Sequence, residues 1–312
     1  MERKQGGYTA LALMVIAFWG SSFAFTKQLI TVLTPTEIMF IRFAIAYVSM
    51  WVVYPKTHRP QSAKAEGKLV LLGILGGSLY FWTENTALAY TQASNVSLVV
   101  TTAPILTAVL AHWFTGDERF HARLFAGFLV AMAGVFLVIF NGQFTLQLNF
   151  TGDLLAIAAA LSWALYTILL KHESTRYNGV FLTRKVFFYA MLTMAPLMAT
   201  KQFSFAHLAL LGRMEVLLPL LFLGLVCSTA CYVCWNRVVA HLGAVRANNF
   251  VYLNPLVAMV VSVLFLHETI TVYMLIGAAL ILGGVFISEK RPRKPRAAAP
   301  LPPIPSHLQE RN

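Results

Sequence analysis

Hydrophobic positions in this chain form long, nearly continuous runs that short polar segments separate. A helix needs about 20 apolar residues to cross the roughly 30 Å hydrocarbon core of a bilayer. The alternation of apolar and polar positions that marks membrane β-strands is missing from the sequence. The pattern therefore predicts an all-α polytopic membrane protein. We expect ten transmembrane helices, at residues 8–30, 35–54, 68–89, 94–114, 123–140, 152–170, 181–200, 216–239, 245–266 and 271–287.

The second half of the chain repeats the first at a nearly constant offset. The matched pairs are Trp19 with Trp163, Lys27 with Lys171, Arg42 with Arg184, Asn85 with Asn236, Pro104 with Pro255, Glu118 with Glu268, Gly127 with Gly277, and Gly134 with Gly284. Each copy has five helices, an odd number, so the second copy must enter the membrane from the opposite face. The halves are therefore expected to be inverted repeats, an architecture typical of alternating-access transporters with a site near the membrane midplane.

These repeats divide the chain into five parts. The expected parts are a cytoplasmic N-terminus (1–7), a first five-helix repeat (8–140), an external linker (141–151), a second five-helix repeat (152–288) and a basic, Pro-rich cytoplasmic tail (289–312). The tail has no apolar face to bury, so we expect it to be disordered and able to contact anionic lipid headgroups.

The composition agrees with a membrane protein, since 58% of the residues are hydrophobic and only 12% are charged. The net charge of +12 is compatible with nucleic-acid binding, but the placement of the charges favours another explanation. With the N-terminus in the cytoplasm, twenty of the 24 Lys and Arg residues lie on the cytoplasmic side, and only Lys201 and Arg213 lie outside. This bias follows the positive-inside rule, so we expect both termini in the cytoplasm, an inner (plasma) membrane location and no nucleic-acid partner.

Three kinds of chemistry find little support in the sequence: metal binding, ATP hydrolysis and catalysis. Cys227, Cys231 and Cys234 share one helical face, but no His or acid on that helix completes a metal site, so we expect no metal and no cofactor. A phosphate-binding GxxxxGK[ST] loop is missing, so transport would run downhill or be coupled to an ion gradient, with protons as the candidate. The spans carry no convergent acid, base and nucleophile, which argues against an enzyme. A receptor or scaffold without transport activity, or a membrane-embedded enzyme, remains the alternative function.

Prolines interrupt two matched spans. Pro104 and Pro255 each remove a backbone donor and clash with the preceding turn, so each helix is expected to bend or open there as a hinge. Polar side chains that could satisfy the freed carbonyls precede both prolines, namely Ser97, Thr101, Thr102, Asn248, Asn249 and Asn254.

Several stretches resemble one known family. They are FWGSSFAFTK (18–27), IRFAIA (41–46), TALAYTQASNVSLVVTTAPILTAVLA (86–111) and AGVFLV (133–138). In this order they are similar to the EamA-type transporters of the drug/metabolite transporter superfamily, over residues 8–288. The resemblance implies a ten-helix inner-membrane carrier, often an exporter, for a small-molecule substrate such as an amino acid, a nucleobase or a drug-like compound. Glu84 departs from it, because we expect a neutral or aromatic residue there.

Glu84 is the only acidic residue well inside a predicted span. It lies about six residues from the end of the third span, so roughly 9 Å deep at 1.5 Å per residue. A lone carboxylate in a membrane is costly, so we expect it to pair with Arg42 or Lys27. Two roles stay open: a static ion pair, or a functional group that binds a substrate ammonium or carries a proton.

Aromatic and amide side chains form the second candidate constellation, because such groups suit a flat or apolar substrate. Plain helix packing is the rival interpretation for each of them. With Glu84, the predicted cavity residues are Trp19, Tyr80, Asn85, Asn95, Trp163, Tyr166, Tyr232, Trp235, Asn236, Asn249 and Tyr252. Small-residue positions such as Gly127 and Gly134 predict close helix packing, which leaves a monomer or a homodimer open.

Overall fold

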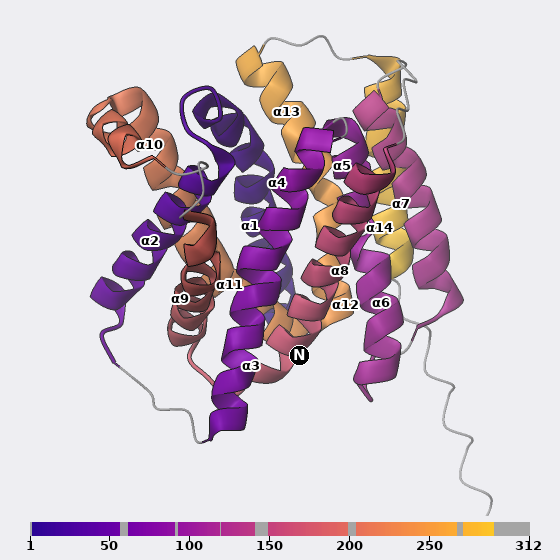
Figure 1. The fold of residues 1–312 in the computed structure, drawn as a ribbon. Helices are drawn as coiled ribbons and strands as arrows, with labels where there is room; N and C mark the ends of the chain where they lie inside the picture. Colours follow the sequence, from indigo (N-terminus) through magenta and orange to yellow (C-terminus); the bar gives the residue numbers. More distant parts are fainter. Residues whose placement is uncertain are drawn as a thin grey trace, which may run out of the picture.

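The computed structural model describes residues 2–56, 62–90, 93–118, 120–140, 149–198, 204–266 and 271–289. Within these ranges all regular secondary structure is helical (Figure 1). In chain order the helices are α1 (Glu2–Leu29), α2 (Pro35–Val53), α3 (Ala63–Gly73), the π-helix η1 (Ile74–Leu79), α4 (Tyr80–Tyr90), α5 (Ala93–Val100), α6 (Ala103–Phe114), α7 (Ala122–Phe140), α8 (Phe150–Glu173), α9 (Gly179–Met198), the 3₁₀ helix η2 (Phe205–Gly212), α10 (Met214–Leu221), the π-helix η3 (Phe222–Ala230), α11 (Cys231–Leu242), α12 (Ala244–Asn249), the 3₁₀ helix η4 (Phe250–Leu253), α13 (Asn254–Leu266) and α14 (Val272–Glu289).

These helices form the ten expected spans. Four spans are composite, namely α3–η1–α4, α5–α6, α10–η3–α11 and α12–η4–α13, while α1, α2, α7, α8, α9 and α14 each form one. Within the described ranges, six stretches are long and apolar enough to cross a membrane by themselves. The chain is therefore a polytopic helical membrane protein. Figure 1 places the start of α1 and the end of α14 at one end of the bundle, which we call the terminal end; the opposite end is the far end.

The two halves are related by a two-fold axis, which the contact between α7 and α14 shows most directly. A Cβ on Gly127 would lie 2.6 Å from the Gly284 carbonyl, and a Cβ on Gly134 would lie 2.5 Å from that of Gly277. The repeat equates Gly127 with Gly277 and Gly134 with Gly284, so each contact is the image of the other. A self-complementary contact of this kind is what a two-fold axis produces. The predicted inverted repeat is thereby confirmed.

Replacing Gly134 by alanine should destabilise the protein, because the new methyl group would meet backbone atoms that cannot move aside. Overpacking of this kind costs about 1–3 kcal/mol. Gly283 on α14 is the matched control, since a Cβ there meets nothing within 4 Å. Thermal unfolding in detergent should show a lower Tm for Gly134→Ala and an unchanged or slightly higher Tm for Gly283→Ala. Equal Tm values for the two variants would contradict the close contact.

The prolines break the fourth and ninth spans as the sequence predicts. Helix α5 ends at Val100 and α6 restarts with Pro104 in its first turn, while η4 separates α12 from α13 before Pro255. The hydroxyl of Thr101 donates to the Ser97 carbonyl (2.7 Å), and that of Thr102 donates to the Val99 carbonyl (2.6 Å). Both carbonyls also accept a backbone N–H, from Thr101 and Thr102 respectively, so the hydroxyls add a second hydrogen bond to each carbonyl beside the break.

Two π-helices mark equivalent places in the third and eighth spans. The wider turn of a π-helix leaves some carbonyls open to other donors, and such segments are frequent at functional sites. The Leu75 carbonyl in η1 accepts from the Ser162 hydroxyl (2.8 Å), and the Cys227 carbonyl in η3 accepts from Trp19 Nε1 (3.0 Å). Each π-helix is therefore tied to a helix of the other half.

Candidate functional site

Trp19 on α1 and Trp163 on α8 meet at the centre of the bundle. Their ring centroids lie 5.6 Å apart with an interplanar angle of 81°. The two residues are equivalent in the repeat, so their contact lies close to the pseudo-two-fold axis. The candidate site between the halves is therefore centred on these two rings.

Further aromatic rings from other spans pack on this pair. Tyr80 lies 5.3 Å from Trp163, and Trp235 lies 5.1 Å from Trp19, measured between ring centroids. Tyr232 contacts Trp19, at 5.5 Å, and Tyr166 contacts Trp163, at 5.2 Å. Six of the predicted aromatic residues thus form one cluster, which we call the aromatic centre: Trp19, Tyr80, Trp163, Tyr166, Tyr232 and Trp235.

Several polar atoms of the aromatic centre have hydrogen-bond partners, although the buried Nε1 of Trp235 has none among the described residues. Trp163 Nε1 donates to Asn248 Oδ1 (3.0 Å), and the Tyr232 hydroxyl donates to the Gly76 carbonyl in η1 (3.1 Å). Hydrogen bonds at ring edges fix the orientation of aromatic planes that are otherwise held only by packing. Trp163, Tyr166, Tyr232 and Trp235 are buried, so among the six rings only those of Trp19 and Tyr80 present a partly exposed surface.

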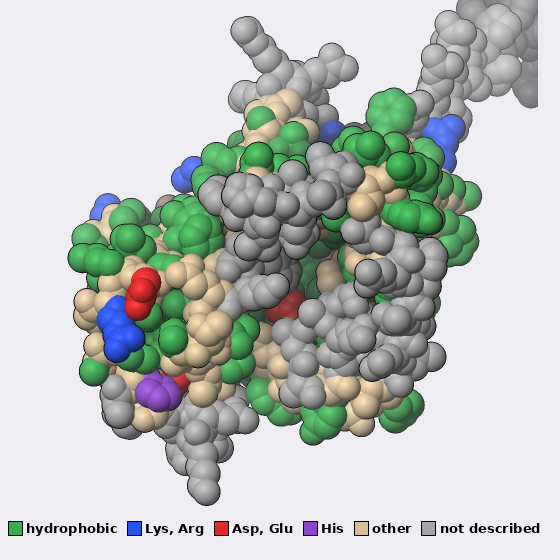
Figure 2. Space-filling view, turned by 90° about the horizontal axis from the view of Figure 1, so that it is seen from above, with side chains coloured by type: hydrophobic (Ala, Val, Ile, Leu, Met, Phe, Trp, Pro, Cys, Tyr) green, Lys and Arg blue, Asp and Glu red, His purple; other side chains and the backbone are tan. Residues whose placement is uncertain are grey.

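Glu84 reaches this surface from α4. Its Oε1 accepts a hydrogen bond from the Tyr80 hydroxyl (3.0 Å), and its side chain is partly exposed although the residue lies well inside the span. Figure 2 views the far end and shows that the surface is hollowed near its middle, where an acidic side chain is visible. A partly exposed carboxylate at this depth indicates a cavity that opens to the far end.

Arg42 on α2 belongs to the same region but does not pair directly with Glu84. Its Nε donates to Ser228 Oγ (2.9 Å), and its guanidinium lies 5.2 Å from the centroid of the Phe81 ring. Among the described residues no side chain lies within ion-pair distance of Glu84. The sequence predicts that Glu84 pairs with Arg42 or Lys27. The direct ion pair with Arg42 is not formed, because the Ser228 hydroxyl and the Phe81 ring hold the guanidinium instead. The side chain of Lys27 lies outside the described ones.

Asn236, Asn249 and Tyr252 are predicted cavity residues that the structure buries between helices. Asn236 is buried, and its Nδ2 donates to the Gly179 carbonyl (3.1 Å) and to Thr183 Oγ1 (2.8 Å), so it joins α11 to α9. Asn249 is buried beside Glu289 at the terminal end, and Tyr252 is buried in the core. Asn85 is partly exposed, with Nδ2 2.9 Å from Met39 Sδ. The side chain of Asn95 lies outside the described ones.

The sequence gives no signal that Ser228 and Gly76 are partners of the site, and it indicates Asn248 only as a partner for carbonyls at the Pro255 break. Ser228 and Gly76 lie in the π-helices, where the widened turn can leave a backbone carbonyl such as that of Gly76 open to another donor. Asn248 is fully buried, and it also donates to Thr107 on α6. The repeated asparagines before Pro255 were the available signal for this residue.

Polar contacts close the terminal end of the bundle between the two halves. The contacts are Lys68–Glu173 (3.2 Å), Lys185–Glu66 (2.7 Å), Tyr189 to Glu66, Arg184 to the carbonyls of Tyr54 (2.7 Å) and Lys56 (2.8 Å), Lys171 to Asp117 (2.6 Å) and Glu118 (3.0 Å), and Tyr8 to His241 (3.0 Å). Arg184 is the repeat equivalent of Arg42, yet it covers the end of α2 and stacks on Trp51 instead of facing the cavity. The structure is therefore closed at the terminal end and hollow at the far end.

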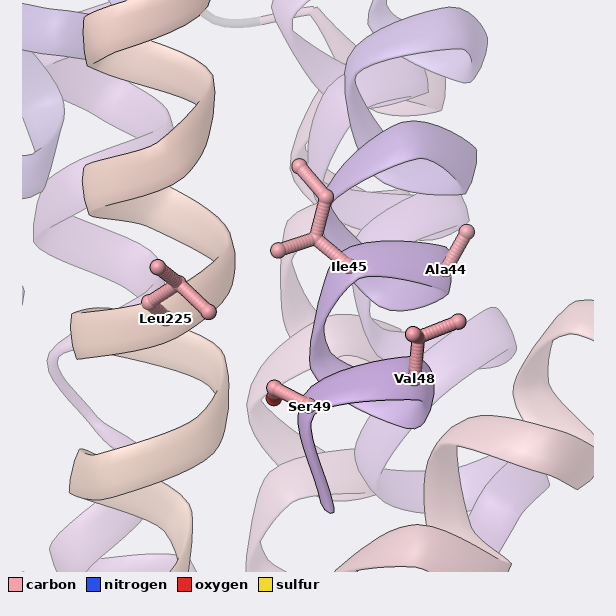
Figure 3. A pocket seen from close by; sticks show the side chains of 5 residues that line it. All are labelled: Ala44, Ile45, Val48, Ser49 and Leu225. Carbon is pink, nitrogen blue, oxygen red and sulfur yellow. The ribbon is translucent and has the colours of Figure 1, made fainter. Parts of the chain in front are cut away.

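One further pocket lies on the outside of the bundle, between α2 and η3 (Figure 3). Its lining comprises Ala44, Ile45, Val48, Ser49 and Leu225. No charged side chain is among these residues, and an apolar surface between two spans is what lipid contacts. The groove is separate from the aromatic centre. Among the described residues there is also no group of three or more His, Cys, Asp or Glu side chains that could hold a metal ion.

Inverted five-helix repeats around a central polar-aromatic site define the class of a membrane transporter fold. The model of the EamA-like transporter family matches residues 7–140 and 150–289, which are the two halves described above. The chain belongs to the EamA-like transporter family.

Curated relatives cover nearly the whole chain. A protein of Archaeoglobus fulgidus named an uncharacterized transporter is 26% identical over 90% of this chain and 96% of its own length. The probable amino-acid metabolite efflux pump of Escherichia coli K12 is 26% identical, with 92% of this chain and 95% of that protein covered. The probable terminal-alkyne amino-acid exporter of Streptantibioticus cattleyicolor is also 26% identical, with 94% of this chain and 96% of that protein covered. A crystal structure with 16% sequence identity superposes with a TM-score of 0.71 over 91% of this chain and 96% of that one, which supports the fold.

Proposed function

We propose that this protein is a secondary transporter that exports an amino acid or a closely similar metabolite across the plasma membrane by alternating access. The observation that carries the proposal is the partly exposed Glu84 carboxylate beside the aromatic centre, in a cavity between inverted repeats. Family membership supports a small-molecule substrate. The names of two relatives, the probable amino-acid metabolite efflux pump and the probable terminal-alkyne amino-acid exporter, support the substrate class and the direction.

The site chemistry suits a zwitterion. Glu84 offers a carboxylate for a substrate ammonium, and two of the three guanidinium nitrogens of Arg42 have no hydrogen-bond partner among the described residues. The partly exposed rings of Tyr80 and Trp19 offer an apolar face for a side chain, with the buried Trp163 ring packed behind them. A substrate that carries both charges satisfies both groups at once, whereas a simple cation would meet repulsion from Arg42.

Orientation follows from the basic residues. The terminal end carries Lys56, Lys64, Lys68, Lys171 and Arg176 among others, while Arg213 is the basic side chain described at the far end. The positive-inside rule places the terminal end in the cytoplasm. In this orientation the structure corresponds to an outward-open state, and the breaks at Pro104 and Pro255 serve as hinges for the change to an inward-open state.

Binding should be detectable as a rise in thermal stability of the purified protein. A ligand present at a hundred times its Kd adds about 2.7 kcal/mol to the free energy of unfolding. We expect zwitterionic amino acids with apolar side chains to raise the Tm, and nucleobases and organic cations without a carboxylate to leave it unchanged. A shift with organic cations alone would contradict the zwitterion site.

A further inference from the structure

The Glu118 carboxylate joins the two halves at the terminal end. Glu118 lies in the segment after α6, in the first half. Its Oε1 accepts from the Ala244 backbone N–H (2.8 Å) and its Oε2 accepts from that of Val245 (2.9 Å), at the start of α12 in the second half. Lys171 at the end of α8 lies 3.0 Å from the same carboxylate. Charged acceptors make hydrogen bonds about twice as strong as neutral ones.

The backbone around this contact is shaped to admit the carboxylate. Gly243 has a φ of +88°, a conformation that side chains disfavour, and a Cβ there would collide with the Glu118 carboxylate. Lys171 also binds both oxygens of Asp117, at 2.6 and 2.7 Å, and these hydrogen bonds hold the pKa of Asp117 below its usual value. The loop after α6 is therefore clamped between α8 and α12.

The two helices that this contact joins have a repeat-equivalent pair at the other end of the molecule. Helices α6 and α12 pack side by side at the terminal end (Figure 1). The repeat equates α6 with α13 and α12 with α5, but α13 and α5 make no comparable contact within the described ranges. The α6–α12 interface is thus closed at the terminal end, while the equivalent α13–α5 interface is open at the far end. Alternating access requires such a difference between the two ends in any single state.

We propose that Glu118 is the latch of the terminal end: its bonds to α12 form when the cavity opens to the far end and break each time it opens to the terminal end. The inference rests on alternating access in the proposed function. It assigns to Glu118 a gating role that is independent of the substrate. Sequence alone pairs Glu118 with Glu268 and Lys171 with Lys27, whose side chains lie outside the described ones.

Hydrogen–deuterium exchange of the purified full-length protein in nanodiscs tests the latch. Glu118→Gln keeps the size of the side chain but removes the charge, and Lys171→Met removes the ion pair while leaving the backbone hydrogen bonds possible. The matched control is Glu215→Gln, which changes an exposed carboxylate on α10 at the far end. We expect Glu118→Gln to speed exchange of the α12 amides about tenfold, the loss expected for one charge-assisted hydrogen bond.

The decisive readout lies at the far end. If Glu118 is a latch, its loss shifts the population toward the state open to the terminal end, so amides of α5 and α13 at the far end should exchange more slowly. Lys171→Met should give the same pattern with a smaller amplitude, and Glu215→Gln should not. Faster exchange of α12 without any slowing at the far end would show a purely local cap and overturn the latch. That outcome would not contradict the proposed transport function, which the flux measurement in proteoliposomes tests separately.

Discussion

Replacing Glu84 by glutamine should reduce transport of a labelled amino acid in proteoliposomes at least about tenfold. Hydrogen bonds to a charged group contribute about 1.5–3 kcal/mol, which corresponds to roughly a ten- to hundredfold change. The Tyr80 hydroxyl can still donate to the glutamine oxygen, so the local structure is preserved while the charge is lost. Both net efflux and counterflow should fall, because the variant binds the substrate ammonium less tightly.

Glu215→Gln is the control, since it removes an exposed carboxylate that lies on α10 at the same far end. Two results would contradict substrate binding by Glu84. Retained counterflow with loss of pH-driven transport would make Glu84 a proton carrier instead. A lower Tm with unchanged transport per folded molecule would show that Glu84 has only a structural role.

Replacing Asn248 by alanine should produce the largest loss of stability among the polar residues of the site. Asn248 is fully buried and joins three spans, because it accepts from Trp163 on α8 and donates to Thr107 on α6. Alanine leaves the buried indole N–H of Trp163 without a partner. We expect a loss of about 2 kcal/mol in the free energy of unfolding, as orphaned buried donors and lost interhelical hydrogen bonds indicate.

Comparing the thermal unfolding of the Asn248→Ala and Asn249→Ala variants isolates the effect of losing the Asn248 hydrogen bonds. Asn249 is the neighbouring asparagine, and the only side-chain hydrogen bond that it makes among the described residues is the long 3.5 Å contact with Glu289. Its replacement should cost less than about 0.5 kcal/mol. If the two variants lose equal stability, Asn248 is not the hub that the geometry indicates.

The inverted repeat could be predicted because the sequence carries it in matched residues. Gly127 and Gly134 pair with Gly277 and Gly284 at a constant spacing, and an odd number of spans per copy requires inversion. The reciprocal backbone contacts of α7 and α14 follow from that symmetry. The openness of one end could not be predicted, since a symmetric sequence permits both states and the packing of α6 on α12 selects one of them.

The site was only partly predictable, for a similar reason. Trp19 and Trp163 stand out because the repeat matches them, and symmetry places equivalent residues near the axis. Asn236 and Ser228 lie on the same span, yet one bonds to α9 and the other to Arg42 on α2. Spacing along a helix gives the face on which a side chain lies, but the partner depends on which helix covers that face, which only the tertiary structure reveals.

Counterflow with the purified protein tests the proposed transport function most directly. Proteoliposomes loaded with an excess of one unlabelled amino acid, without ATP, take up the same labelled amino acid only if a carrier exchanges it across the membrane. Each of the twenty standard amino acids serves in turn as the probe, with protein-free liposomes as the background. We predict transient accumulation of at least one apolar amino acid, and its reduction at least about tenfold in Glu84→Gln. If the uptake of all twenty labelled amino acids stays at the level of protein-free liposomes although the protein is correctly folded, amino-acid transport by this chain is contradicted.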